Sequence, residues 1–309
     1  MRTSVTTAAA PTAAPANARP AVKIAVASGK GGTGKTTVAT GLAALLAADG
    51  PVVLADLDVE EPNAQLFLAG RLLHEEEVTK SVPHWVADAC TFCGLCQDVC
   101  NFGAVLALPD EVMVFDNLCH ACFACSELCP TGALPMQPRP MGTLRHRREG
   151  RLDSLESRLL VGQEQAVPLI RHTLRFIDRT FPGAPLVILD APPGTSCPVI
   201  EATRHADLVL LVTEPTPFGL HDLRLAVATM RQLERPVKVV INRHGIGDAG
   251  VENYCSSEGL DVVARIPHSR RVAELYAEGR LPADEVPALR QALVQIASSL
   301  TGAGIGGAS

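Results

Sequence analysis

The sequence lacks long apolar runs and an excess of positive charge, and residues 1–20 lack the continuous apolar region typical of a secretory signal. No segment approaches the roughly 18 consecutive apolar residues of a membrane-spanning helix, so we expect no membrane span. Its 27 lysines and arginines are outnumbered by 33 acidic residues, which leaves no basic surface for nucleic acid or an anionic membrane. Prolines interrupt the only apolar stretch in residues 1–20, so we predict a disordered tail there, with a transit peptide as the alternative.

Cysteine density is low as well. Ten cysteines among 309 residues are too few for a small secreted scaffold stapled by disulfides. A chain of this length can bury a large core and suggests roughly two domains. Disorder of the whole chain is therefore excluded.

Short apolar runs alternate with longer segments of helical period along most of the chain. The runs are rich in β-branched residues and leucine, as expected of strands that are buried on both faces. This alternation predicts an α/β fold with a doubly wound, mostly parallel sheet. The predicted strands are residues 22–28, 52–56, 186–190, 207–213, 237–242 and 262–266, and the predicted helices are residues 35–48, 198–205, 219–233, 271–278 and 285–300.

The alternation breaks between about residues 75 and 165. Eight of the ten cysteines fall inside this interval, which predicts a small second domain inserted into the first. Prolines and arginines in residues 135–151 indicate a return linker. The predicted organisation is a disordered tail (1–20), a discontinuous α/β domain (21–86 and 137–301), an insert (87–136) and a flexible tail (302–309).

A glycine-rich phosphate loop directly follows the first predicted strand. It runs Gly29, Lys30, Gly31, Gly32, Thr33, Gly34, Lys35, Thr36, and Thr37 continues into the first predicted helix. Its backbone N–H groups can surround phosphate oxygens at the positive end of that helix. We expect Lys35 to contact the terminal phosphates of ATP and the Thr36 hydroxyl to ligate Mg²⁺. The alternative is a dinucleotide-binding turn, in which the Lys-Thr pair has no use.

Lys30 adds a second signal. A lysine at this point of the loop resembles the deviant phosphate loop of the MinD, ParA, Mrp and nitrogenase iron-protein superfamily. In that family this lysine reaches the nucleotide of a partner subunit. The resemblance therefore implies an ATP-sandwich dimer, either a homodimer or a heterodimer with a paralogue.

Further landmarks of the family follow in order. Residues 56–63 resemble its switch I segment, in which Asp58 would orient the attacking water, and residues 189–195 resemble its switch II, with Asp190 as the Walker B carboxylate that holds a Mg²⁺-bound water. Helix or turn capping is the alternative role for each aspartate. Asn242 matches the position that recognises adenine, although asparagine is also an ordinary turn residue.

The cysteines of the insert form two identical runs of C-x₂-C-x₂-C-x₃-C. This is the pattern of bacterial two-cluster ferredoxins, in which the fourth cysteine of each run ligates the other cluster. A zinc ribbon is the competing interpretation. A proline follows the second run as it does in ferredoxins, whereas Asn101 follows the first. The predicted ligands are Cys90, Cys93, Cys96 and Cys129 for one [4Fe–4S] cluster and Cys119, Cys122, Cys125 and Cys100 for the other.

Two cysteines remain outside these runs. Cys197 has a spacing from Asp190 similar to that of a cluster ligand in the nitrogenase iron protein, and Cys255 stands alone where Mrp-type scaffold proteins carry a C-x₂-C. Buried structural thiols and a bridging cluster between subunits are the alternatives for this pair. Cluster ligands and free thiols together favour a reducing cytoplasm.

The resemblance covers about residues 22–300 and implies a slow, partner-stimulated ATPase with an inserted ferredoxin domain. The leading hypothesis is that nucleotide-driven dimer switching is coupled to electron transfer toward a redox partner protein. The alternatives are an iron–sulfur cluster carrier or assembly ATPase and a positioning ATPase of the MinD or ParA type. The acidic balance of the sequence also predicts an acidic surface around the insert, where a positively charged partner would dock.

Overall fold

The computed structural model describes residues 22–184 and 186–300. The two predicted tails, residues 1–20 and 302–309, lie outside the described residues. No helix in the described part of the chain has the length and apolar character needed to cross a membrane.

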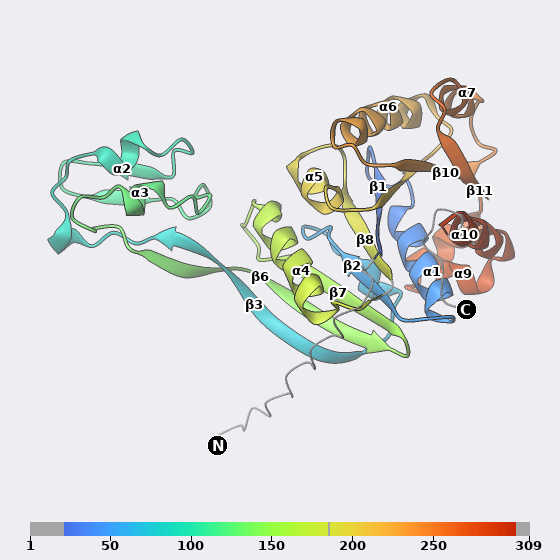
Figure 1. The fold of residues 1–309 in the computed structure, drawn as a ribbon, viewed down its shortest axis with the longest axis horizontal. Helices are drawn as coiled ribbons and strands as arrows, with labels where there is room; N and C mark the ends of the chain where they lie inside the picture. The colour runs from blue at the N-terminus through green and yellow to red at the C-terminus, as the bar shows by residue number, and fades with distance from the viewer. Residues whose placement is uncertain (1–21, 185, 301–309) are drawn as a thin grey trace, which may run out of the picture.

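A nine-stranded sheet forms the centre of the molecule, in the order β11-β10-β9-β1-β8-β2-β7-β6-β3 (Figure 1). The strands are β1 (Val22–Ser28), β2 (Val52–Asp56), β3 (Arg71–Pro83), β4 (Val105–Ala107), β5 (Val112–Val114), β6 (Met136–Glu149), β7 (Leu152–Leu159), β8 (Leu186–Pro193), β9 (Leu208–Thr213), β10 (Val237–His244) and β11 (Asp261–Pro267). The α-helices are α1 (Lys35–Ala47), α2 (Leu95–Asp98), α3 (Ala124–Glu127), α4 (Ala166–Thr180), α5 (Cys197–Thr203), α6 (Pro217–Gln232), α7 (Gly250–Ser257), α8 (Arg270–Ala277), α9 (Pro282–Glu285) and α10 (Pro287–Leu300).

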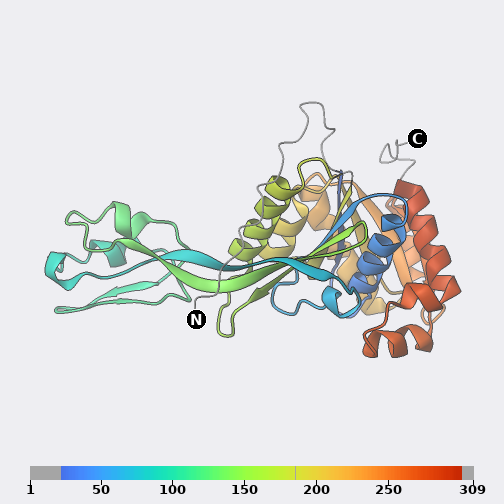
Figure 2. The same cartoon turned by 90° about the horizontal axis from the view of Figure 1, so that it is seen from below.

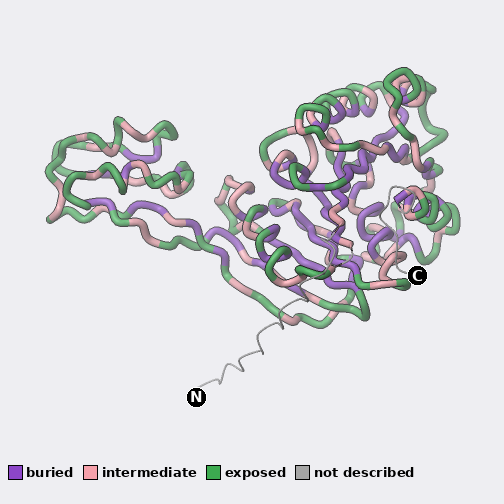
Figure 3. Tube along the Cα trace, viewed as in Figure 1, coloured by how far each residue is buried: buried purple, intermediate pink, exposed green. Residues whose placement is uncertain are grey.

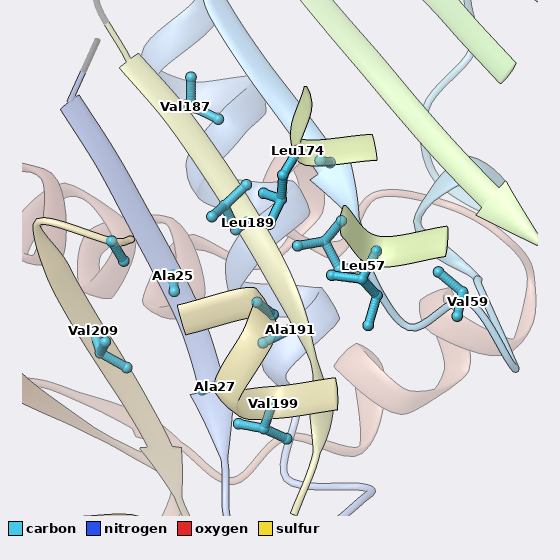
Figure 4. Packing of buried hydrophobic residues seen from close by; sticks show 14 of the residues in the cluster. Ala25, Ala27, Leu57, Val59, Leu174, Val187, Leu189, Ala191, Val199 and Val209 are labelled. Atoms are coloured by element: carbon cyan, nitrogen blue, oxygen red, sulfur yellow. The ribbon is translucent and has the colours of Figure 1, made fainter. Parts of the chain in front are cut away.

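The strands from β11 to β7 all pair in parallel, so the predicted parallel sheet is confirmed. Both of its faces are covered by helices. In β1 the alternation of side chains separates two cores: Ala25 and Ala27 face the helices α4 to α7, whereas Ile24 and Val26 face α1 and α10. Figure 4 shows part of the first core, where Leu174 of α4 lies near Leu189 of β8 and Val199 of α5 lies near Ala191.

Residues 135–151 were expected to be a linker, and this expectation is wrong. They form β6, which pairs antiparallel with β3 over its whole length and with β7 only from Gly142 to Glu149. Two of the three prolines that suggested a linker, Pro138 and Pro140, lie in β6 beyond the part that pairs with β7. Two prolines spaced two residues apart both lack the N–H group that would point to the same strand edge. In this part of β6 that edge has no hydrogen-bonded neighbouring strand, because β7 pairs only from Gly142 onwards.

Other elements were also missed by the strand and helix predictions, among them β3, the short elements of residues 87–127 and the three named next. β7 and α4 fall in the interval where the alternation seemed to break, and α7 follows β10. The predicted helix 285–300 is divided at Val286, because Pro287 begins a new helix as α10. The other predicted elements are present with ends shifted by at most three residues.

The outer halves of β3 and β6 form a two-stranded arm that leads away from the sheet, as Figures 1 and 2 show. At its end lies a small lobe, residues 84–135, which we call the cysteine lobe. It contains α2, α3 and the β4–β5 hairpin, and most of its residues are exposed (Figure 3). Val105, Val112 and Leu134 form its small buried centre together with Cys125.

The cysteine lobe holds the whole net charge of the protein. Residues 84–135 contain six acidic residues and no lysine or arginine. The chain as a whole has a formal net charge of −6, so the remainder is neutral. The acidic residues expected around the insert are therefore present in the cysteine lobe.

Gly142 lies where the arm leaves the sheet, and we predict that it tolerates no side chain. A Cβ atom there would be 2.6 Å from the carbonyl oxygen of Arg158 and 2.7 Å from Leu169 Cδ2. The Gly142→Ala variant should lose about 1–3 kcal/mol of unfolding free energy, measured by urea denaturation. Gly50→Ala is the control, since a Cβ atom at Gly50 meets nothing within 4 Å. Equal stability of the two variants would contradict the prediction.

Candidate functional site

The phosphate loop occupies the turn between β1 and α1. Gly32 and Gly34 have φ angles of 77° and 93°, in the left-handed region that favours glycine. Gly34 also meets Asn242, whose Nδ2 would lie 2.3 Å from an added Cβ atom. The Asn242 amide donates to the Thr33 carbonyl oxygen at 2.7 Å. Asn242, predicted as an adenine contact, thus also supports the loop.

A cleft of about 470 Å³ opens in front of this loop. It is lined on one side by residues 31–37 of the loop and on the other by the segment after β2, including Asp58 and Asn63. Asn242 and the side chain of Tyr276 from α8 close it. Loop residues 31–37, Asp58 and Asn242 therefore lie around one cleft of a size suited to a small-molecule cofactor, whereas the predicted Gly29, Lys30 and Asp190 are not among its lining residues.

Asp190 lies beneath the loop, at the carboxyl end of β8. It is fully buried, and its Oδ1 is 3.9 Å from Lys35 Nζ. Neither carboxylate oxygen has a hydrogen-bond partner among the described residues. A buried carboxylate without hydrogen bonds is costly even with a lysine 3.9 Å away, and a cation with oxygen ligands would satisfy it. Asp190 and the neighbouring Thr36 therefore fit the Mg²⁺ of a bound nucleotide.

Asp56 is a functional residue that the sequence analysis missed. It pairs in register with Asp190 across β2 and β8 and is also buried. Its carboxylate accepts from the backbone N–H groups of Asp58 at 3.1 Å, Asn63 at 2.8 Å and Ala64 at 2.9 Å. Asp56 therefore folds the segment 57–64, which we call the switch I loop, over the cleft. Its position at a strand end next to Asp58 was the only sequence signal.

Three aspartates of this site have raised pKa values. Burial, followed by repulsion from Asp190, raises the pKa of Asp56 to about 8. Burial likewise raises the pKa of Asp190, although Lys35 and Thr36 oppose the shift. The pKa of Asp58 is raised by burial and by Asp190, with Lys35 acting in the opposite direction. Without a cation, the site therefore favours protonated carboxyl groups.

Lys30 is held within its own chain. Its Nζ contacts Glu214 Oε1 at 2.5 Å, and Arg243 Nη1 contacts Glu214 Oε2 at 3.0 Å. Arg243 also donates to the carbonyl oxygen of Gly32. Burial opposes ionisation of Glu214, but the hydrogen bond and charge of Lys30 outweigh it, so the pKa of Glu214 is lowered. Glu214, at the carboxyl end of β9, was not predicted as part of the site.

The two cysteine runs of the lobe adopt the same local geometry. Phe92 N–H donates to Cys90 Sγ and Ala121 N–H to Cys119 Sγ, each at 3.4 Å, and both donor residues have positive φ angles. The fourth cysteine of each run accepts in the same way from the residue four positions later, at 3.3 Å in both cases. The repeat in sequence is therefore also a repeat in backbone conformation.

The cysteines gather in two mixed sets. Cys90, Cys93, Cys96 and Cys129 line one cavity together with apolar residues that include Trp85. Among the described residues, no three His, Cys, Asp or Glu side chains form a group suited to a single metal ion.

The second set surrounds Cys125. Burial raises its pKa to about 11, and repulsion from Cys119, Cys100 and Cys122 adds to this shift. Burial also raises the pKa of Cys119, with Cys122 and Cys100 among its neighbours. In both sets the fourth cysteine comes from the opposite run, the crossing typical of two-cluster ferredoxins. Sulfur donors in mixed sets of four suit iron–sulfur clusters, so the residues fit that cofactor.

The last two cysteines differ from each other. Cys255 lies on α7 and is buried in the core, and burial raises the pKa of its thiol to about 11, which fits a structural thiol. Cys197 is exposed at the start of α5. The expectation that it is buried is wrong.

Comparisons with known proteins agree with this geometry. A family model described as the CobQ/CobB/MinD/ParA nucleotide binding domain matches residues 24–283. An uncharacterized protein of Methanocaldococcus jannaschii is 30% identical over 83% of this chain and 89% of its own length. A protein of Pyrococcus horikoshii named iron-sulfur cluster carrier protein is 24% identical over 82% of this chain and 76% of its own length.

Solved structures share the fold. The MinD cell division protein of Aquifex aeolicus is 19% identical, with a TM-score of 0.56 over 91% of this chain and 97% of that protein. MinD of Pyrococcus horikoshii, in complex with Mg-ADP, is 20% identical, with a TM-score of 0.55 over 91% of this chain and 96% of that protein.

The raised carboxyl pKa values predict how stability depends on pH. A folded-state pKa above the unfolded value gives stability that is present at low pH and lost as pH rises through the folded pKa. The melting temperature of the metal-free protein should therefore fall between about pH 4 and about pH 8 because of Asp56. Stabilisation by Mg-ATP should grow over the same range, because the cation binds the ionised carboxylates.

Calorimetry in buffers of equal ionic strength measures both trends. The Asp190→Asn variant removes the repulsion that acts on Asp56, so its melting temperature should fall less steeply. An identical slope in wild type and variant would show that the carboxyl pair does not control the dependence.

Proposed function

Because the chain belongs to the CobQ/CobB/MinD/ParA nucleotide-binding domain family, we propose that this P-loop ATPase couples nucleotide-driven switching to electron transfer through two [4Fe–4S] clusters in the cysteine lobe. The observation that carries the proposal is the repeated geometry of the two cysteine runs, with the fourth cysteine of each run placed in the opposite set. When bound, such clusters store and pass single electrons.

The residues around the cleft have defined roles in this proposal. Lys35 contacts the terminal phosphates, and Thr36 and Asp190 hold Mg²⁺. Asp58 orients the attacking water at the cleft wall, and Asp56 keeps the switch I loop folded around it. These residues make hydrolysis depend on the conformation of the switch I loop, which is the property that a coupled ATPase needs.

Charge defines the partner class. A lobe with six acidic residues and no lysine or arginine attracts a redox protein with a positive face. Exposed Phe92, Phe123 and Leu128 would contribute apolar contact to such a complex. The free thiols are consistent with a reducing compartment such as the cytoplasm.

Iron counting tests the cofactor. The anaerobically purified chain should hold about eight irons, two clusters of four. Cys129→Ala and Cys96→Ala should abolish the same EPR signal, and Cys100→Ala and Cys125→Ala the other one. Cys197→Ala, outside both sets, is the control and should keep all of the iron. Loss of one signal by both Cys90→Ala and Cys100→Ala, with Cys129→Ala in the other group, would contradict the crossed sets.

Stopped-flow oxidation tests the coupling. The reduced protein is mixed with an oxidised acceptor protein that has a basic face, in the presence of ATP, ADP or no nucleotide. The rate should depend on the nucleotide in wild type and lose this dependence in Asp58→Asn. Equal rates in all three conditions would exclude coupled electron transfer.

Lys30 and Glu214 test the dimer. Closure of an ATP sandwich requires Lys30 to leave Glu214, so Glu214→Gln should favour the dimer by roughly 0.5–1 kcal/mol, or about two- to fivefold in the dimerisation constant. Size-exclusion chromatography with a non-hydrolysable ATP analogue measures it. Glu252→Gln breaks a surface pair with Arg265 and is the control. Weaker dimerisation of Glu214→Gln than of wild type would refute this role.

Cluster delivery is the second candidate function, favoured by the similarity to the Pyrococcus iron-sulfur cluster carrier protein and by the exposed Cys197. A carrier should transfer its cluster to an apo-ferredoxin in the presence of an external chelator. An electron-transfer protein should keep its iron while it is oxidised and reduced repeatedly.

A further inference from the structure

Lys80 is a buried cation at the junction of the arm and the cysteine lobe. It lies on β3 and is only 5% exposed. Its Nζ donates to the carbonyl oxygens of Asp116 at 2.7 Å and Cys119 at 3.4 Å, and to Gln165 Oε1 at 3.4 Å. These three acceptors match the three N–H donors of an ammonium group. Lys80 therefore brings a positive charge to the backbone of a predicted cluster ligand.

This charge has no equivalent inside the lobe. Residues 84–135 contain no lysine or arginine, so cations reach the lobe only from neighbouring elements. Arg139 is the partner of Lys80 in the β3–β6 register, and its Nε lies 3.5 Å from Asp116 Oδ2. The Arg139 side chain is 48% exposed, so solvent screens its charge. Lys80 is buried, so its charge is screened much less.

Gln165 connects Lys80 to the ATPase domain. Its Oε1 accepts from Lys80, and its Nε2 donates to the Asn117 carbonyl oxygen at 3.0 Å. Gln165 directly precedes α4 and ends the segment 158–165, which we call the connecting segment. Gln165 therefore links the lobe to the ATPase domain directly, in addition to the β3–β6 arm.

The other end of the connecting segment contacts the switch I loop. Leu159 N–H donates to the Val59 carbonyl oxygen at 2.9 Å, and Arg158 Nη2 donates to the Pro62 carbonyl oxygen at 3.1 Å. In the middle, Leu160 N–H donates to the Met141 carbonyl oxygen of the arm. Eight residues therefore span from the wall of the nucleotide cleft to the base of the cysteine lobe.

We propose that Lys80 is a positioning residue that raises the reduction potential of the cluster site formed by Cys100, Cys119, Cys122 and Cys125, and that the connecting segment makes this effect depend on nucleotide. The inference rests on the proposed function, because it requires bound clusters. Reduction takes one electron from the reductant and adds one negative charge at the site, which the Lys80 ammonium stabilises. A shift of the switch I loop moves the connecting segment, and Gln165 then changes the position of Lys80.

Redox titration monitored by EPR tests the inference on the reconstituted full chain, with dithionite as the reductant. Lys80→Met should lower the potential of one of the two clusters by roughly 59 mV or more, a tenfold change for a one-electron couple. Lys80→Arg keeps the charge and should restore most of the potential. Arg139→Met is the matched control and should leave both potentials within a third of that shift.

Nucleotide dependence is measured in the same titration with and without a non-hydrolysable ATP analogue. Wild type should show a shift in the Lys80-dependent potential, and Gln165→Ala should lose this shift while it keeps the nucleotide-free potential. Full iron content with no effect of Lys80→Met, or an equal effect on both clusters, would overturn this inference alone. A wild-type chain with about four irons or fewer would overturn the proposed function as well.

Discussion

The pairing of β6 with β7 is the constraint on which the rest of the molecule depends. It makes the arm a continuation of the sheet that carries the phosphate loop, so the lobe and the nucleotide cleft share one hydrogen-bonded framework. A flexible linker at this place would allow the lobe to rotate freely. The β6–β7 ladder instead holds the arm in a fixed register with the sheet. Small movements at the cleft can therefore be transmitted to the lobe without loss of register.

Within the sheet, the parallel order places the acidic chemistry. β2 and β8 are neighbours, so their carboxyl ends bring Asp56 and Asp190 side by side below the loop. Ionisation of both buried carboxyl groups would place like charges side by side, a repulsion that a divalent cation relieves. Binding of Mg²⁺ therefore favours the ionised carboxyl groups, and the switch I loop is attached to one of them, Asp56.

Much of this could be predicted from the sequence. The phosphate loop and the cysteine runs are local patterns in which spacing carries the chemistry, and the strands of the parallel sheet are continuous apolar runs. Asp58 and Asp190 were predicted from their resemblance to the switch segments of the family. β3 and β6 could not be predicted in the same way. Both strands are rich in charged residues, and β6 also contains Pro138 and Pro140, so neither strand is a continuous apolar run like those of the parallel sheet.

Contacts between distant segments were equally hidden. Glu214 and Lys80 have ordinary neighbours in the sequence, and their roles arise only when β9 meets the phosphate loop and when β3 meets the lobe. In the sequence, Asp56 is the first residue of the switch I segment, in which Asp58 was the aspartate predicted to be functional. Electrostatic pairs between residues far apart in the sequence depend on the strand topology. They cannot be read from a single sequence without the fold.

The uneven distribution of charge has a consequence for encounter rates. With all of its net charge at one end of an elongated shape, the protein has a large permanent dipole along the arm. In an electric field set up by a cationic surface, such a particle turns its acidic end forward before contact. The screening length is about 8 Å at physiological ionic strength, so this preorientation acts only over the last layers of water and weakens as salt is added.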